Sequence, residues 1–336
     1  MRSEEERDAR IEALMEPYRG EVPGAGLLVV EGGVPMLRRA CGYADLEGAV
    51  RTSSLTNYRL ASLTKQFTAA ATLLLEEDGR LELDAAAYRW LPALPPAARA
   101  ITIRQLLTHT SGILDYEELI PPERTLQVDD ADVLALLEQE DRTYFEPGAR
   151  YRYSNSGYVL LGLVLSAAAQ TEFRELIESR IFVPLGMRTS VVHREGISTV
   201  SHRAFGYTAQ ESSWRRTDQD LTSATLGDGG IYSSIEDLER WVLALDEERL
   251  LRPESWRSAF APAVHTDLRG TAYGFGWQIS GDTVWHSGET VGFRNVIVRF
   301  LADRLTVVLL TNRNGPEPYA TALAIAAAFQ DSPRET

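Results

Sequence analysis

Strand-type runs of residues lie at the two ends of this 336-residue chain and are almost missing from its middle. Near the N-terminus, residues 26–30 are apolar throughout, and residues 34–37 follow after a Glu31-Gly32-Gly33 turn that is typical of a β-hairpin. Four more runs occupy the last third, at 273–280, 283–286, 291–300 and 305–311. An apolar run without alternation indicates a strand buried on both faces. The simplest architecture that buries such a strand is one sheet built from both ends of the chain.

The region between the strand-type runs has the pattern of short helices and proline-rich loops. Helical patterns appear at 129–139, 156–169 and 172–180, and an alanine-rich helix is expected at 317–330. We therefore predict an α+β fold, in which an antiparallel sheet of about five strands is flanked by helices. Residues 1–80 and 211–336 would form this discontinuous sheet domain, and residues 81–210 an inserted all-α domain.

Composition excludes several classes of function. The net charge is −14 and no basic run is present, which argues against a nucleic-acid partner. With one cysteine the chain cannot form an internal disulfide. No run approaches the roughly 18–20 apolar residues of a membrane span, and the N-terminal residues lack the apolar segment of a signal peptide. We expect a cytoplasmic protein with no membrane partner.

The chemistry is expected at Ser62-x-x-Lys65, which opens a strongly helical run. Residues three apart share a helix face, and the N-terminal N–H groups disfavour an ammonium and favour an oxyanion. So short a pattern can arise by chance. However, Lys65 is the single lysine among 34 basic residues, and all others are arginines, which cannot lose a proton. This bias favours a functional serine–lysine pair over coincidence.

Two further motifs stand where a sheet and a helical insert would meet. Tyr153-x-Asn155 precedes the long helix of the insert, and His286-x-Gly288 ends a strand in the last third. Tyr153 lies among other tyrosines, so a packing role competes with a catalytic one. Asn155 could be only the N-cap of the following helix. The remaining histidines are scattered without ligand spacing, so we expect no metal site.

The order and spacing of these three motifs resemble the serine β-lactamase and penicillin-binding-protein superfamily. The resemblance covers nearly the whole chain and is closest to the class C-like branch, which includes class C β-lactamases, family VIII carboxylesterases, D-aminopeptidases and DD-peptidases. It implies a β-lactamase/transpeptidase-like fold with the active site between the two predicted domains.

The resemblance also implies a role for each motif. Ser62 would be the nucleophile that forms an acyl-enzyme, and Lys65 and Tyr153 the proton-transfer pair, with the general base left open between them. Asn155 would orient Lys65 and bind substrate. The third motif, His286, Ser287 and Gly288, would form the strand that binds substrate. The backbone N–H groups of Ser62 and Glu289 would form the oxyanion hole. Because Gly288 has no side chain, substrate could lie close along this strand.

His286 departs from the family pattern, which has lysine at this position. A histidine is mostly neutral near pH 7, so recognition of a substrate carboxylate should weaken. Arg294 could restore a positive charge or could be an ordinary exposed strand residue. We therefore expect a cofactor-independent serine hydrolase of small carboxylic esters. The alternatives are a D-amino-acid peptidase, amidase or weak β-lactamase, or a non-catalytic ligand-binding member of the fold. Oligomeric state is left open.

Overall fold

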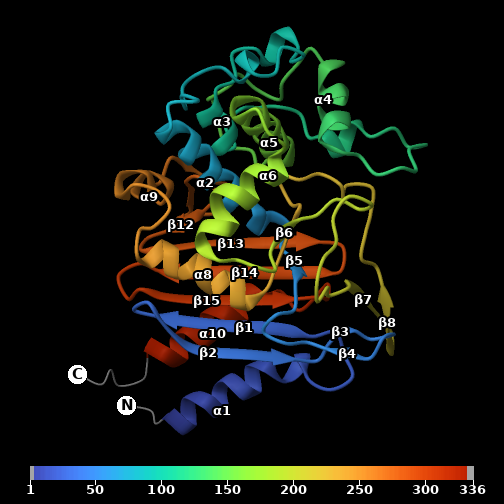
Figure 1. The fold of residues 1–336 in the computed structure, drawn as a ribbon, viewed down its shortest axis with the longest axis vertical. Coiled ribbons are helices and arrows are strands. Elements are labelled where there is room, and N and C mark those ends of the chain that lie inside the picture. Colours follow the sequence, from blue (N-terminus) through green and yellow to red (C-terminus); the bar gives the residue numbers. More distant parts are fainter. Residues whose placement is uncertain (1–3, 331–336) are drawn as a thin grey trace.

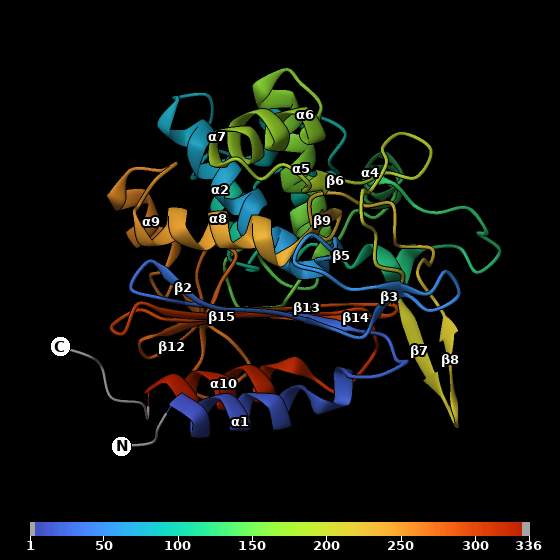
Figure 2. The same ribbon diagram turned by 60° about the horizontal axis from the view of Figure 1, so that its bottom comes forward.

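The structure is a computed structural model, and it describes residues 4–330. An eight-stranded antiparallel sheet forms the middle layer, in the order β10-β11-β12-β13-β14-β15-β1-β2. Helices α1 (Glu4–Met15) and α10 (Pro318–Gln330) cover one face, and the remaining large helices lie over the other. Figures 1 and 2 show these three layers. The α+β class and the antiparallel sheet predicted from the sequence are confirmed.

Five long strands form most of the sheet, and they come from both ends of the chain. They are β1 (Ala25–Glu31), β2 (Val34–Cys41), β13 (Thr283–Thr290), β14 (Phe293–Phe300) and β15 (Leu305–Thr311). The two ends join where β1 pairs with β15, with Leu28 opposite Val308. Glycines 32 and 33 both have positive φ in the β1–β2 turn, which fits the predicted hairpin.

The sheet has three more strands than the sequence predicted. They are short, β10 (Val264–His265), β11 (Ala272–Tyr273) and β12 (Gln278–Ser280), and so carry no clear alternating pattern. The expected single strand at 273–280 is wrong, because the chain turns at Gly276, whose φ is +79°. A Cβ at this glycine would also stand 2.8 Å from the Lys65 carbonyl oxygen.

Both faces of β1 and β15 are buried, as the apolar run at residues 26–30 predicts for β1. Leu27 and Val29 of β1 pack in the cluster under α1 and α10, whereas Leu28 and Val30 pack in the larger cluster on the opposite face. That face carries α2 (Thr64–Glu77) and α8 (Ile235–Asp246). The alternation follows from the period of two in a strand, and it fixes which face α2 occupies.

The middle of the chain supplies further helices, and α5, α6 and α7 among them lie well above the sheet in Figure 2. They are α3 (Ile103–Leu107), α4 (Asp130–Glu138), α5 (Asn155–Ala169), α6 (Phe173–Ile177) and α7 (Val183–Leu185). The region also holds short strands that the sequence did not signal, β6 (Val191–Val192) and β7 (Tyr207–Gln210). The other short elements are β3 (Tyr43–Asp45), β4 (Val50–Arg51), β5 (Tyr58–Arg59), β8 (Ser213–Arg216), β9 (Ile231–Ser233) and α9 (Pro253–Ala259). The domain boundaries near 81 and 210 stay a prediction.

Candidate active site

Ser62 lies in a 3₁₀ turn (Ala61–Leu63) that leads directly into α2. Ala61 has a φ of +50°, a backbone conformation that a residue with a side chain rarely adopts. Strand β13 passes beside this turn, and a Cβ on Gly288 would stand 2.0 Å from the Leu60 carbonyl oxygen. The lack of a side chain at 288 therefore serves the contact between β13 and the Ser62 turn. Our expectation that it also lets substrate lie close along β13 stays a prediction.

Lys65 connects the serine to the helical layer. Its Nζ donates to Ser62 Oγ at 2.9 Å, to Asn155 Oδ1 at 2.9 Å and to the Asp228 carbonyl oxygen at 3.0 Å. The side chain is completely buried. Burial is the largest cause that lowers the Lys65 pKa, to about 8, against the opposing effect of the Asp228 and Glu117 carboxylates. This pKa leaves about a tenth of the amine neutral at pH 7.

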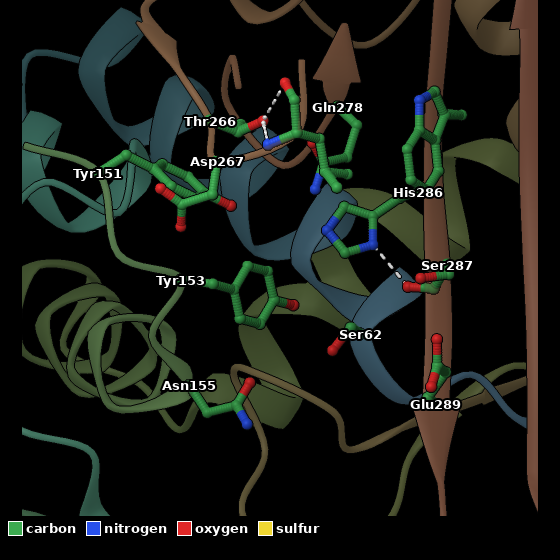
Figure 3. Close-up of a pocket in the computed structure, with 12 residues that line it drawn as sticks. Ser62, Tyr151, Tyr153, Asn155, Thr266, Asp267, Gln278, His286, Ser287 and Glu289 are labelled. Atoms are coloured by element: carbon green, nitrogen blue, oxygen red, sulfur yellow. Dashed lines mark hydrogen bonds between the residues drawn. The ribbon is translucent and has the colours of Figure 1, made fainter. Parts of the chain in front are cut away.

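Tyr153 and Asn155 enter the site from the segment that begins α5. The N-cap of this helix is Ser154, whose Oγ accepts from the Gly157 N–H at 3.1 Å, so Asn155 is not the cap. The Tyr153 phenol points toward Ser62 (Figure 3) and is within hydrogen-bonding reach of it. Its ring also packs 4.3 Å from the His109 ring, centroid to centroid, so it has a packing contact as well. Burial raises the Tyr153 pKa, which disfavours the phenolate.

His286 lies on β13 at the wall of the same pocket and is almost fully buried. Its Nδ1 is 2.6 Å from the Ser287 carbonyl oxygen, which can only accept, so Nδ1 carries the proton. Its Nε2 then accepts from the Tyr273 hydroxyl at 3.0 Å. Burial lowers the His286 pKa to about 3, with a further contribution from nearby Lys65. The histidine is therefore neutral and both of its nitrogens are already engaged.

Strand β13 also carries Ser287 and Glu289 into the pocket (Figure 3). Strand β12 pairs with β13 only as far as Trp285, so residues 286–290 have a strand partner on the β14 side alone. The free side faces the Ser62 turn. An extended substrate segment could lie along this free side.

Two hollows meet at Ser62. The larger has a volume of about 460 Å³. It is lined by the segment with Tyr151 and Tyr153, by His286 of β13, and by Asp267 and Leu268 of the β10–β11 loop. The smaller, of about 60 Å³, lies on the Asn155 side and is lined by acidic residues. Both share Ser62, Asn155 and Glu289. A reacting carbonyl at Ser62 would thus have space on two sides.

Arg294 supplies no free cation to this site. Its NH1 donates to the carbonyl oxygens of Thr290 and Phe293, both at 2.8 Å, and its Nε lies 3.1 Å from Glu317 and 3.7 Å from Glu289. It lines neither hollow. Within residues 4–330, no group of three or more His, Cys, Asp or Glu side chains could hold a metal ion.

Sequence reasoning missed several residues at the site. Residues 227–229 form a turn whose Asp228 carbonyl oxygen accepts from Lys65 Nζ. Glu117 accepts from Asn155 Nδ2 at 2.8 Å, and Tyr273 binds His286. No motif spacing marks these residues, since their role depends on where loops from different parts of the chain meet.

The fold and this arrangement define a serine hydrolase of the Ser-x-x-Lys type, with the serine, the lysine and a phenol in one pocket. The chain belongs to the beta-lactamase family, whose model matches residues 7–332. It is 33% identical to a penicillin-binding protein of Bacillus subtilis over 90% of this chain and 70% of the relative. It is also 29% identical to a D-aminopeptidase of Gluconobacter oxydans, over 96% of this chain and 62% of that protein.

A solved structure of similar fold is that of an octameric penicillin-binding protein homologue from Pyrococcus abyssi. It superposes with a TM-score of 0.83 at 26% identity, and covers 97% of this chain and 77% of that one. The chain thus spans between about three fifths and four fifths of these relatives. Among the helices of residues 4–330, none has the length and apolarity that crossing a bilayer requires.

Proposed function

We propose that this hydrolase works through a Ser62 acyl-enzyme on small carboxylic esters that lack a carboxylate next to the scissile bond. The observation that carries the proposal is the Ser62–Lys65 contact of 2.9 Å, made to a buried amine with a lowered pKa. Neutral Lys65 takes the Ser62 proton while Oγ attacks the carbonyl carbon. Burial disfavours the Tyr153 phenolate, so Lys65 is the better base of the two.

Tyr153 is then the group that passes its proton to the departing oxygen, and Lys65 returns a proton to it. Asn155 holds Lys65 in place through the 2.9 Å contact to its Oδ1. The peptide N–H groups of Ser62 and Glu289, on the two segments that Gly288 brings together, would stabilise the oxyanion. Water enters by the reverse sequence and releases the acid. No step requires a cofactor.

Neutral His286 supports the choice of substrate. A lysine at this position would offer a charge to a substrate carboxylate, whereas His286 has its two nitrogens bound to Tyr273 and Ser287. β-Lactams and peptides with a carboxylate beside the reacting bond should therefore bind weakly. A peptidase or amidase for D-amino-acid substrates is the second candidate, and the 29% identity to a D-aminopeptidase favours it.

Intact-mass analysis after treatment with a fluorophosphonate tests the proposal. We expect one adduct in the wild type and none in Ser62→Ala. Hydrolysis of short p-nitrophenyl esters, compared with D-alanyl p-nitroanilide, then separates the ester from the amide candidate. Lack of an adduct with any acylating agent would instead favour a non-catalytic binding protein.

A further inference from the structure

His109 contacts the chain on both sides of Tyr153. Its Nδ1 accepts from the Ser154 N–H at 3.1 Å, and its backbone carbonyl oxygen accepts from the Arg152 N–H at 2.9 Å. Its ring also packs on the Tyr153 ring, with the centroids 4.3 Å apart and the ring planes 36° from each other. One residue therefore holds Tyr153 by its ring and by both residues that flank it.

The backbone of His109 is in the left-handed region, with a φ of +57°. Residues with a side chain seldom adopt this conformation, and they keep it only where the surrounding contacts fix it. His109 is 1% exposed, and in this conformation its carbonyl oxygen and its ring both reach residues 152–154. The unusual backbone of His109 is thus tied to the segment that carries Tyr153.

The buried His109 ring is neutral. Because Nδ1 accepts a hydrogen bond, the one ring proton is on Nε2, which has no hydrogen-bond partner among the residues that the structure describes. Three more tyrosine rings lie around the imidazole at centroid distances of 4.6 to 5.9 Å, those of Tyr151, Tyr158 and Tyr273. A second proton would go to Nδ1, directly against the Ser154 N–H. Burial is the largest cause that lowers the His109 pKa well below its usual range, and Lys65 acts in the same direction.

His109 has no direct route to the reacting atoms. It lines neither of the two hollows at Ser62, its Nδ1 is occupied, and its Nε2 already carries a proton. It can therefore affect the reaction only through the residues that it holds. Among these, Tyr153 is the one whose phenol points toward Ser62. A displacement of this phenol by about 1 Å would be enough to slow a proton transfer on the order of 100-fold.

We propose that His109 is a positioning residue, which sets the place of the Tyr153 phenol by accepting the Ser154 N–H. This inference rests on the proposed role of Tyr153 as proton donor to the leaving group. It adds to that role the residue that keeps the donor in place.

The choice of leaving group can report where the phenol lies. Ethoxide is strongly basic and must take a proton as it departs, whereas p-nitrophenolate is stable in neutral water and departs without one. A displaced Tyr153 should therefore slow hydrolysis of ethyl butyrate much more than hydrolysis of p-nitrophenyl butyrate. A smaller fraction of folded enzyme would instead lower both rates by the same factor.

Two variants separate the ring contact of His109 from its hydrogen bond. His109→Phe keeps a ring beside Tyr153 but has no acceptor for the Ser154 N–H. We expect its kcat/KM to fall about 100-fold for ethyl butyrate and less than about tenfold for p-nitrophenyl butyrate. His109→Asn loses the ring, but its Oδ1 can take the place of Nδ1 and asparagine tolerates a positive φ, so both values should stay within about tenfold of wild type.

His202→Phe is the matched control, because His202 also has a positive φ, of +47°, and is exposed and lines neither hollow at Ser62. It should leave both kcat/KM values within about twofold of wild type. A second test repeats His109→Phe in a Tyr153→Phe background, where no phenol remains to be positioned. There the change at 109 should cost less than about threefold on ethyl butyrate.

Three results would overturn the proposal. One is a fall by the same factor on both esters in folded His109→Phe. Another is a folded His109→Asn that loses more than about tenfold on either ester, a test that also stands if melting curves show that His109→Phe does not fold. The third is an equal loss with and without the Tyr153 phenol. Fluorophosphonate labelling of Ser62 separates these failures from failure of the acyl-enzyme itself, because fluoride departs without a proton donor.

Discussion

The Leu60 carbonyl oxygen lies so close to Gly288 that a Cβ on residue 288 would be only 2.0 Å from this oxygen. Leu60 precedes the turn that carries Ser62, and Gly288 lies in the middle of β13. The serine and the strand that faces it therefore come together through direct backbone contact. The separation of the two segments depends on this one glycine.

Gly288→Ala should destabilise the protein by more than about 3 kcal/mol, because two backbone segments must move apart. The fraction of Gly288→Ala that still folds should hydrolyse esters at least roughly 100-fold more slowly than the wild type, as expected when reacting groups are displaced by about 1 Å. Gly157→Ala is the control, since its Cβ would lie 3.5 Å from the Leu106 carbonyl oxygen, an ordinary contact between α5 and α3. Thermal melting and ester kinetics on both variants check this, and an unaltered melting temperature in Gly288→Ala would contradict it.

Lys65→Arg should lower kcat for ester hydrolysis by roughly 10³-fold or more, because a guanidinium keeps its proton and cannot act as the base. Lys65→Met should lose as much, since neither variant has a titratable amine. Melting curves show whether the larger arginine disturbs the buried site. Appreciable turnover in folded Lys65→Arg would mean that Lys65 is not the base.

The acylation rate should depend on pH through Lys65. Its pKa of about 8 means that the neutral base becomes scarcer as pH falls, so the rate should fall about tenfold per pH unit below 8 and level off above it. His286 has a pKa of about 3 and stays neutral throughout. Stopped-flow acylation from pH 5 to 9 checks this, and a titration near pH 6.5 would show that a histidine controls the reaction instead.

His286→Lys should increase acylation by a β-lactam relative to a neutral ester. The new ammonium would face a substrate carboxylate, whereas the native imidazole is held by Tyr273 and the Ser287 carbonyl. We expect the ratio of the two kcat/KM values to rise about tenfold, measured with nitrocefin and p-nitrophenyl butyrate. His286→Gln, which adds no charge, should leave this ratio near the wild-type value; an equal rise in both variants would contradict a charge effect.

Tyr153→Phe should lower kcat by roughly 10²–10⁴-fold, because the leaving group loses its proton donor. Tyr151→Phe removes a hydroxyl from the same pocket and should cost less than about fivefold, because the proposed chemistry gives Tyr151 no proton to transfer. Comparable losses in the two variants would indicate that the tyrosines act by packing, Tyr153 against His109 and Tyr151 against Tyr273.

The sequence predicted β15 with the same ends that the structure has, because 305–311 is a mostly apolar run with polar residues on either side. It failed at 273–280, where two short strands flank a turn at Gly276. Strands of two or three residues are too short to show a period, and they form because the neighbouring strand is already in place.

At the site, local pattern identified the Ser62–Lys65 pair, since three-residue spacing and the lone lysine are properties of the chain itself. The position of Lys65 near a helix N-terminus also suggested why this lysine could be neutral. In the structure, the largest cause of the lowered Lys65 pKa is burial. Burial depends on packing against α5 and the Asp228 loop, which no local pattern reports.

The sequence by itself thus indicated the class of fold through periodicity and the Ser62–Lys65 pair through spacing, which are local properties, and the family resemblance added Tyr153 and Asn155 to the predicted site. Only the tertiary structure decided that both nitrogens of His286 are engaged, that Arg294 is occupied by carboxylates, and that Asp228 and Glu117 share a hollow with Ser62. Charge state and proximity arise from burial and from contacts between segments far apart in the chain, and these exist only once it has folded.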